Sequence, residues 1–279
     1  MLPILCPFCQ HSLHFNDERS YICENNHNFD ISKEGYINLL PVNKKKSKSP
    51  GDNDMMVKAR REFLEQGFYD PLMQEIKNVI ENELSIDSNE INILDSGCGE
   101  GYYSENALSN LKEIKSNIIG TDISKYAVKH AAKKYKDNFY FVSSIYNLPV
   151  QTDSIDLILS VFSPNDIKEF SRVLNQNGHL IIVSPGENHM KQLAELIYDS
   201  FRPHEYNIIE KTGEPFSHLS TYRKTFEIGI NDSSMLQKLL KMTPYYWNTS
   251  KEAQEKIESC NAISITCDFN ITVFTKNTK

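Results

Sequence analysis

A glycine-rich loop near the middle of the 279-residue chain carries the residue types best suited to hold a ligand. The apolar residues Ile91, Ile93 and Leu94 read as the end of a buried strand, and Asp95 follows them directly. Gly97, Gly99 and Gly101 come next, in a G-x-G-x-G pattern that lets the backbone turn tightly and approach a ligand closely. A helix is expected after the loop. A strand, a glycine loop and a helix in this order hold a nucleotide-like ligand at the carboxyl end of the first strand of an α/β sheet.

A second acidic residue, Asp122, ends the next predicted strand, residues 117–121. A carboxylate there is placed to accept hydrogen bonds from both hydroxyls of a ribose. Asp122 could instead cap the following helix, but Ser124 can fill that role, which favours the ribose. The loop lacks the G-x-G-x-x-G spacing of dinucleotide sites, and Asp95 directly before it also disfavours a nicotinamide site. The combination resembles the S-adenosylmethionine site of Rossmann-like methyltransferases.

This resemblance implies roles for the residues around the loop. Asp95 stands where an acid meets the amino end of S-adenosylmethionine, directly or through water, and the backbone of residues 97–101 lines the methionine part. Ser143 or Ser144 stands where related enzymes often have an acid that binds adenine N6, so the chain departs from the pattern there. Two apolar residues, Ile123 and Ile145, are candidates to flank the adenine ring.

Four residues near the N-terminus have the spacing of zinc ligands, C-x2-C-x13-C-x3-H: Cys6, Cys9, Cys23 and His27. Thiolates and an imidazole in two pairs suit a tetrahedral zinc ion, and three thiolates with no open position make the site structural. Hairpin strands are expected between the pairs, over residues 13–15 and 19–22. His11 and His14 are weaker ligand candidates because they lie in this hairpin. So short a module has too little core to fold alone, and metal binding would supply much of its folding free energy. The alternative is a hairpin with reduced cysteines.

The rest of the chain alternates strands and helices, which predicts a parallel sheet covered on both faces, with a ligand at the carboxyl ends of its strands. Further strands are expected over residues 139–142, 156–161, 179–183, 221–228 and 263–274. Helices are expected over 55–66 (capped by Asp54), 70–84 (opened by Asp70 and Pro71), 102–111, 124–135, 165–174, 189–203, 233–241 and 250–258. The predicted fold class is therefore α/β, a Rossmann-like S-adenosylmethionine methyltransferase domain with a small N-terminal zinc-binding module. We divide the chain into the zinc-binding module (1–35), a basic connector with helices (36–84) and the methyltransferase domain (85–279).

Composition and charge narrow the classes of function. The chain has 39% hydrophobic residues, six cysteines and a net charge of −7, and no apolar run approaches the roughly 20 residues that span a membrane. We expect a cytoplasmic protein without a membrane partner. Nucleic-acid-binding proteins are usually basic, but residues 43–61 carry seven Lys/Arg against two acidic residues. Such a strip could contact a phosphate backbone. The alternative is that the lysines are only a solvated charge run in a linker.

Several motifs together resemble one family over nearly the whole chain, the bacterial 23S ribosomal RNA guanine-N1 methyltransferases. They are Cys6-Pro-Phe-Cys9, Cys23-x3-His27, Phe29-Asp30, Lys33-Glu34-Gly35-Tyr36-Ile37-Asn38-Leu39-Leu40-Pro41-Val42, Pro50-Gly51-Asp52, Met56, Ala59-Arg60-Arg61-x-Phe63-Leu64, Gly97-Cys98-Gly99-Glu100-Gly101-Tyr102-Tyr103, Met242-Thr243-Pro244 and Asp268-Phe269-Asn270-Ile271. The glycine motif alone is generic, but joined to the zinc module and the Glu34–Pro41 segment it is specific.

The resemblance implies a homodimeric enzyme that makes 1-methylguanine in a hairpin of domain II of the large-subunit RNA, with the zinc module helping to grip the RNA. It also favours, within the family, the branch typical of Gram-negative bacteria. It adds Glu100 and Tyr102 of the glycine motif, with Tyr69 and His189, to the residues that bind the methyl donor. From the residues themselves, Tyr69 could equally be a packing aromatic and His189 the start of a helix.

Two further expectations concern the RNA. Phe162, after the strand 156–161, could stack on the target guanine or be a core residue. Arg60, Arg61 and the lysines of residues 44–48 are candidates for phosphate contacts. Two other functions stay open at this point: methylation of a small molecule by the central domain, and RNA binding by a zinc ribbon with an inactive cofactor domain.

Overall fold

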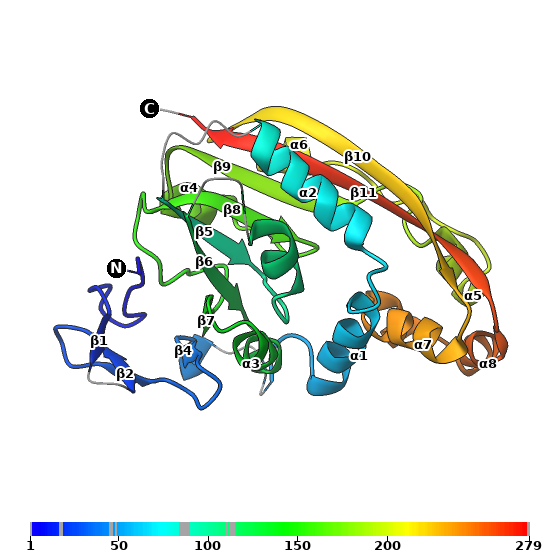
Figure 1. Cartoon of the computed structure of the whole chain (residues 1–279), viewed down its shortest axis with the longest axis horizontal. Helices are drawn as coiled ribbons and strands as arrows, with labels where there is room; N and C mark the ends of the chain where they lie inside the picture. Colours follow the sequence, from blue (N-terminus) through cyan, green and yellow to red (C-terminus); the bar gives the residue numbers. More distant parts are fainter. Residues whose placement is uncertain are drawn as a thin grey trace.

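The computed structural model describes residues 2–16, 19–44, 47, 49–83, 90–109, 111 and 115–277. Its centre is an eight-stranded sheet in the order β10-β11-β9-β8-β5-β6-β7-β4 (Figure 1). The strands are β4 (Ile37–Asn38), β5 (Glu90–Ser96), β6 (Lys115–Asp122), β7 (Phe139–Val142), β8 (Ile155–Val161), β9 (Leu174–Pro185), β10 (Phe216–Ile230) and β11 (Ile263–Lys276).

Strands β4 to β9 pair in parallel, as the alternating pattern predicts. Strand β11 pairs antiparallel with β9, and β10 antiparallel with β11. The chain between β10 and β11 folds into helices at one end of the sheet, so it returns along the same edge instead of crossing a face. All parallel strands therefore present their carboxyl ends on one side, where a ligand is held.

The helices are α1 (Asp54–Leu64), α2 (Asp70–Glu83), α3 (Lys125–Lys134), α4 (Ile167–Val173), α5 (Lys191–Ile197), α6 (Ile208–Thr212), α7 (Ser233–Lys241) and α8 (Lys251–Ser259), with a π-helical turn η2 (Ser104–Leu108) and 3-10 turns η1 (Val42–Lys44) and η3 (Pro244–Asn248). Ser124 caps α3 as predicted, by accepting the N–H of Ala127 at 3.2 Å. The predicted cap of α1 is wrong: Asn53 is the N-cap because its side chain accepts the N–H of Met56. The helix expected over 102–111 is shorter and partly π-helical, and that expected over 189–203 ends at Ile197.

Alternate residues of β5 and β8 enter two separate apolar clusters, one on each face of the sheet. Ile93 and Leu159 pack with α1, α2, α7 and α8. Their neighbours Leu94 and Ile158 pack with α4 and with N-terminal residues such as Leu13. The N-terminal module thus shares the core of one face.

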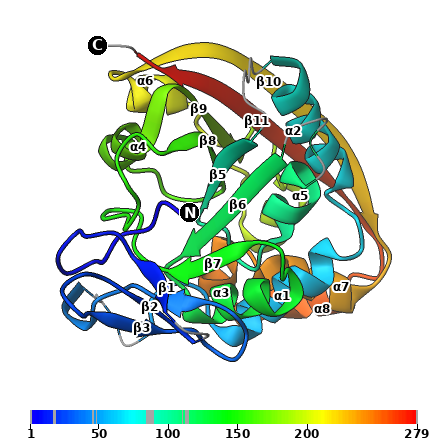
Figure 2. The ribbon, with the colours of Figure 1, turned by 60° about the vertical axis from the view of Figure 1, so that its left-hand side comes forward.

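The N-terminal module forms a three-stranded antiparallel sheet of β1 (His14–Asn16), β2 (Ser20–Ile22) and β3 (Asn28–Asp30). The first two strands confirm the expected hairpin, whereas β3 was not predicted. Figure 2 shows this small sheet beside β7 and β4, at the edge opposite β10 and β11. The N–H of Leu5 donates to the carbonyl of Pro149 at 2.8 Å, and Ile4 bridges to Val150. The module is therefore attached by backbone pairing as well as by apolar contacts.

The connector, residues 36–84, was expected to hold helices but no strand, yet it contributes β4, which pairs with β7 and lengthens the sheet. None of the helices in the described part of the chain is long and apolar enough to cross a membrane.

Candidate active site and metal centre

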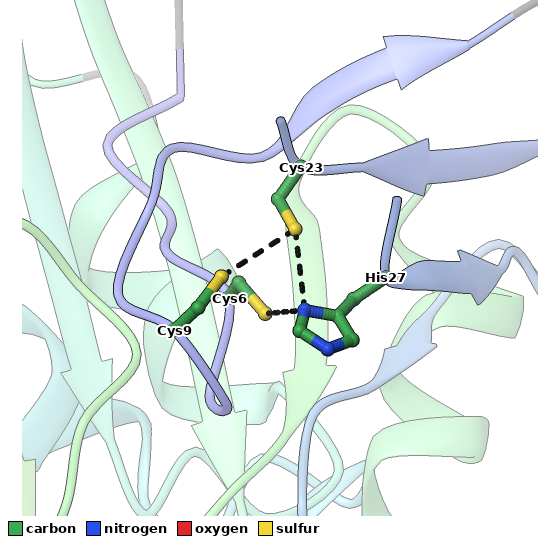
Figure 3. Close-up of side chains that lie close together, drawn as sticks. All are labelled: Cys6, Cys9, Cys23 and His27. Carbon is green, nitrogen blue, oxygen red and sulfur yellow. Dashed lines mark hydrogen bonds between the residues drawn. The ribbon is translucent and has the colours of Figure 1, made fainter. Parts of the chain in front are cut away.

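The four cysteine and histidine residues predicted to bind zinc converge in the N-terminal module (Figure 3). Cys9 Sγ lies 3.6 Å from Cys23 Sγ, and His27 Nδ1 lies 3.4 Å from the sulfurs of both Cys6 and Cys23. A tetrahedral zinc ion with Zn–S bonds of about 2.3 Å requires sulfurs about 3.7 Å apart. The donor set and its spacing therefore fit one structural zinc ion held by Cys6, Cys9, Cys23 and His27.

The glycine loop lies at the carboxyl end of β5, and Gly97, Gly99 and Gly101 all have positive φ angles. A Cβ atom on Gly97 would lie 2.0 Å from Ser163 Oγ, and one on Gly101 would lie 2.8 Å from the ring of Tyr135. A Cβ on Gly99 would meet nothing closer than Arg60 Nη1, at 4.0 Å. The loop is thus packed against protein at two glycines and open at Gly99, where a ligand can approach the backbone.

Alanine substitutions should separate these two roles. Gly97→Ala should lower the free energy of unfolding by more than about 2 kcal/mol, because the methyl group overlaps Ser163 in addition to the strained φ of +78°. Gly99→Ala should cost only about 1 kcal/mol of backbone strain but weaken donor binding, because its methyl group enters the open side. Chemical denaturation and titration calorimetry measure the two effects. Equal stability of the two variants would contradict this assignment.

Asp122 lies beside the open side of the loop. Its Oδ2 accepts the N–H of Gly99 at 3.0 Å, and its Oδ1 accepts the N–H of Ser124 at 2.7 Å. Burial raises the pKa of Asp122, and these two N–H groups and the Arg60 charge oppose that rise. A carboxylate has about four acceptor positions, so this one keeps capacity for two further donors.

Asp95 is buried under the loop and accepts a hydrogen bond from the Ser104 hydroxyl. Burial raises its pKa to about 7, the Ser104 hydroxyl opposes this rise, and the charge of Asp122 adds to it. Only 1% of Asp95 is exposed, so in the described structure its side chain does not reach the surface of the site. Contact with an amino group would therefore pass through an intervening group.

The raised pKa of Asp95 predicts a pH effect on stability. The folded state keeps this proton up to about pH 7, whereas the unfolded chain releases it near pH 3.8. Folding therefore binds a proton in this window, and the Asp95 contribution to stability falls as the pH rises from 5 to 8, by on the order of 3 kcal/mol.

The comparison is made between the wild-type chain and Asp95→Asn, by urea unfolding at pH 5 and pH 8. Burial lowers the pKa of His189 to about 3, so below about pH 6.5 its contribution to the free energy of unfolding rises with pH, opposite to that of Asp95. This contribution is the same in both proteins and cancels in the comparison. The variant should lose less stability than the wild type on going to pH 8. Identical pH dependence would refute a buried proton on Asp95.

Three other residues of the predicted donor site lie around this loop. Tyr69 is 1% exposed, its ring packs edge-on against Phe269 at 5.3 Å, and its hydroxyl has no hydrogen-bond partner among the described residues. The hydroxyl of Tyr102 donates to Asp70 at 3.0 Å. Ser144 accepts the N–H of Tyr146 at 3.3 Å. The unpartnered Tyr69 hydroxyl is a buried polar group that a bound ligand could satisfy.

The side chain of Glu100 is turned away from the open side of the loop. It is 2% exposed, neither carboxylate oxygen accepts a hydrogen bond from a residue that the structure describes, and Arg61 Nε lies 3.8 Å away. Burial raises the pKa of Glu100, and the charge of Arg61 opposes this. A contribution of Glu100 to ligand binding would come from its backbone.

The two arginines expected to contact phosphate have internal partners. Arg60 pairs with Asp52 and donates to the carbonyl of Met242 at 3.3 Å. Arg61 contacts Glu65 and His130 in addition to Glu100. Of the lysine run, Lys45, Lys46 and Lys48 lie outside the described residues. Arg60 instead lies beside Gly99 of the glycine loop, a position that the sequence did not reveal.

Phe162 and His189 lie side by side close to the glycine loop, because Ser163, next to Phe162, lies against the Cβ position of Gly97. Phe162 has a φ of +52° and is 41% exposed, and its ring is nearly parallel to that of His189 at 6.1 Å. His189 Nδ1 accepts the N–H of Asp268 at 3.3 Å and its ring lies 4.6 Å from that of Phe269. A φ above zero is rare for a bulky residue and here turns Phe162 outwards instead of into the core.

Asp268 was not predicted as a site residue, yet it holds the loop that carries His189. This buried carboxylate accepts hydrogen bonds from Arg223 Nε and Nη2 and from the N–H of Asn188. The Arg223 charge holds the pKa of Asp268 low, at about 2. In the sequence, the sign of this role was a single acidic residue inside the largely apolar segment 263–274.

One cavity of about 500 Å³ adjoins the loop after β6. Its walls include Ile123, Val142, Tyr126 and connector residues Ser49 and Pro50. Ile123 is one of the two residues expected to flank adenine, so that side of the ligand site borders the connector.

Comparisons with known proteins agree with the geometry. Residues 4–48 match the zinc-ribbon family described as "RlmA, N-terminal", and residues 87–245 match the family described as "Methyltransferase domain". The YxjB protein of Bacillus subtilis (strain 168), named as a 23S rRNA (guanine-N(1)-)-methyltransferase, is 31% identical over 96% of this chain and 95% of its own. The 23S rRNA (guanine(748)-N(1))-methyltransferase of Streptomyces fradiae is 27% identical over 87% of this chain and 85% of its own.

Among solved structures, that of the YcgJ protein from Bacillus subtilis aligns with a TM-score of 0.48 and 17% identity, over 74% of this chain and all of that chain. The zinc ribbon, the methyltransferase domain and the likeness to YxjB over nearly the full length lead to one assignment. The chain belongs to the family of S-adenosylmethionine-dependent 23S rRNA (guanine-N1)-methyltransferases.

Proposed function

We propose that the protein methylates N1 of a guanine in a domain II hairpin of 23S rRNA and acts as a homodimer in the cytoplasm. The observation that carries this proposal is the presence, in one chain, of a methyl-donor loop with Asp122 beside it and a four-ligand zinc ribbon built into the same core. A methyltransferase for small molecules would not need the ribbon, and a binding protein with an inactive domain would not need the open loop at Gly99.

The proposed donor site comprises Tyr69, Asp95, Gly97, Gly99, Glu100, Gly101, Tyr102, Asp122, Ser144 and His189. In it, Asp122 accepts the ribose hydroxyls and the loop backbone lines the methionine part. Tyr69 offers its hydroxyl as a hydrogen-bonding group to the donor. Asp95 is buried, so it acts on the donor through an intervening group. The proposed zinc ligands are Cys6, Cys9, Cys23 and His27.

S-adenosylmethionine supplies a methyl group on a sulfonium, which guanine N1 attacks in line. The N1 proton must leave before or during attack. His189 is a poor base for it, because burial lowers its pKa to about 3 and its Nδ1 already accepts the Asp268 N–H. The acceleration that these residues can supply is the positioning of both reactants and the exclusion of water.

The target guanine must leave its stack to reach the donor. Phe162 is exposed, its ring lies 6.1 Å from that of Tyr103 after the glycine loop, and it can stack on that base. The relative whose name gives a position acts on guanine 748. This favours methylation of the equivalent guanine by this protein. It disfavours the expected membership of the branch typical of Gram-negative bacteria.

Mapping of 1-methylguanine tests the proposal. Ribosomal RNA from a deletion strain should lack one 1-methylguanine in domain II, and the complemented strain should regain it. In vitro, purified protein should transfer labelled methyl groups from S-adenosylmethionine to the isolated hairpin. Absence of label in RNA, with donor binding intact, would favour a small-molecule substrate, whereas absence of donor binding would favour a non-catalytic RNA-binding protein.

A further inference from the structure

The cavity of about 500 Å³ beside the loop after β6 lies between the connector and α3. Its walls come from β4 and the residues around it, from the connector and from α3, and both β4 and α3 pack against β7 (Figure 1). Of the described residues expected around the methyl donor, only Ile123 belongs to these walls. The cavity is therefore a second space next to the donor site, with Ile123 between the two.

The two sides of this cavity are fixed to each other. A Cβ atom on Gly51 of the connector would lie 2.9 Å from Ser124 Cβ, and the Ser124 hydroxyl donates to the carbonyl of Asp52 at 2.6 Å. Beyond the end of α3, Lys136 Nζ donates to the carbonyl of Glu34 at 2.7 Å. A ligand in the cavity would thus be held at a set distance from the donor loop.

The wall of the cavity suits the flat ring of a nucleobase. Its buried residues are Tyr36, Leu40 and Val142, whereas Tyr126 is 41% exposed. Small-molecule sites have volumes of about 300–1,000 Å³ and are lined mainly by apolar and aromatic side chains. An accessible aromatic ring is how proteins bind unpaired bases, because stacking needs only a base plane.

The charges at the cavity favour an anion. Lys125 and Lys129 line it, and Glu34 is the acidic residue among its described walls. The Glu34 carboxylate faces Lys129 at 3.6 Å. Lys125 is exposed and has no ion-pair or hydrogen-bond partner among the described residues, so its charge is available to a phosphate.

Acidic residues on the neighbouring segments have partners of their own. Asp52 pairs with Arg60, and Asp54 pairs with Lys58. Asp122 is buried in the donor site, where its carboxylate accepts two backbone N–H groups. These groups therefore leave the positive charge of Lys125 largely uncompensated.

The lysines continue along α3 past the cavity. Lys125, Lys129 and Lys133 are all exposed and follow one another at four-residue spacing, which places them about 6 Å apart along one side of the helix. Residues 125–134 of α3 include no acid, and the first acidic residue after them is Asp137. A row of cations favours a ligand with successive phosphates, an RNA strand, over a single free nucleotide.

We infer that this cavity binds one unpaired nucleotide of the RNA substrate, with its base on Tyr126 and its phosphate at Lys125. This inference rests on the proposed function and adds a contact with the substrate outside the donor site. Because Ile123 separates the two spaces, the bound nucleotide anchors the RNA while the target guanine enters the donor site.

The test uses full-length, zinc-loaded protein and the transcribed domain II hairpin. Tyr126→Ala should raise the Kd for the hairpin about 10-fold, the loss of one stacked base, and Tyr126→Phe, which keeps the ring, should recover most of the affinity. Lys125→Ala should reduce the slope of log Kd against log salt concentration by about 0.7, the loss of one phosphate contact on a single strand. The Kd for S-adenosylmethionine should stay unchanged in all three variants.

Lys251→Ala is the matched control for the lysine. Lys251 is the first residue of α8, as Lys125 is of α3, and each follows a serine that caps its helix. Both lysines are exposed, but Lys251 is not part of the cavity. This variant should bind the hairpin as the wild type does, with the same salt dependence.

Three results would overturn the inference. The first is unchanged hairpin affinity and salt dependence in both Tyr126→Ala and Lys125→Ala. The second is weaker S-adenosylmethionine binding by Tyr126→Ala, which would make the cavity part of the donor site. The third comes from titration with guanosine 5′-monophosphate alone: if both variants lost its binding but kept that of the hairpin, the cavity would take a free nucleotide.

Failure of this inference and failure of the proposed function give different results. Hairpin binding that depends on Tyr126 and Lys125, without any methyl transfer to the hairpin, would support the cavity and contradict the proposed reaction. Methyl transfer to the hairpin that both variants leave unaltered would support the reaction and contradict the cavity.

Discussion

Replacement of Asp122 by alanine should weaken S-adenosylmethionine binding by roughly 100-fold. Each carboxylate oxygen of Asp122 already accepts one backbone N–H, and the remaining acceptor positions suit the two ribose hydroxyls. Hydrogen bonds to a charged group contribute about 1.5–3 kcal/mol each, so the loss of two partly compensated bonds corresponds to about 3 kcal/mol. Titration calorimetry measures the change in Kd, and thermal unfolding checks that the fold persists.

The chain offers a matched control for this substitution. Asp232 also accepts the N–H of the residue two positions later, at 2.9 Å from Ser234, and caps α7. Asp232→Ala removes the same kind of local hydrogen bond without touching the donor loop. It should lower stability by about 1 kcal/mol and leave the Kd for the donor unchanged. If both variants lost donor affinity equally, Asp122 would act only as a cap.

The central domain was predictable because its signals are local. Glycines before a helix, an acid after each of two strands and apolar runs of strand length all follow from short stretches of chain, and the structure confirms β5 to β8 within a few residues. The N-cap residues of the helices were harder to predict than the strands. Asn53 and Asp54 are both good N-cap residues. Inside the helix, Asp54 pairs with Lys58 one turn later and with His130, which only the fold brings close.

The side-chain environment of the site depended on contacts between distant segments. Arg60 and Arg61 looked like free cations in a basic strip, yet Asp52, Glu65 and Glu100 surround them. Asp268 looked like part of a strand, but it closes a network with Arg223 and the loop that carries His189. The Arg61–Glu65 pair has the i,i+4 spacing of a helix, but the pairs of Arg61 with Glu100 and of Asp268 with Arg223 join residues through the tertiary fold, and no spacing in the sequence encodes them.

Substitution of Cys23 by serine should remove the zinc and strongly destabilise the protein. Apparent zinc-binding free energies in zinc-finger peptides are about 10–16 kcal/mol, and much of that is folding free energy. Cys6 and Cys23 are buried in the same cluster as Ile4 and Leu13, which packs on the sheet of the methyltransferase domain. Loss of the metal should therefore expose apolar residues of both parts and reduce solubility as well as the Tm.

Metal analysis of the purified protein should give one zinc per chain for the wild type and close to none for Cys23→Ser. Cys260→Ser is the matched control, because Cys260 is a partly exposed free thiol outside the four-residue cluster. It should keep both the zinc and the Tm. Chelation of the wild type should reproduce the Cys23→Ser phenotype, with the N-terminal module cleaved first in limited proteolysis. Unchanged zinc content in Cys23→Ser would refute the ligand set, since a tetrahedral site with one ligand replaced by a hydroxyl cannot retain the metal as tightly.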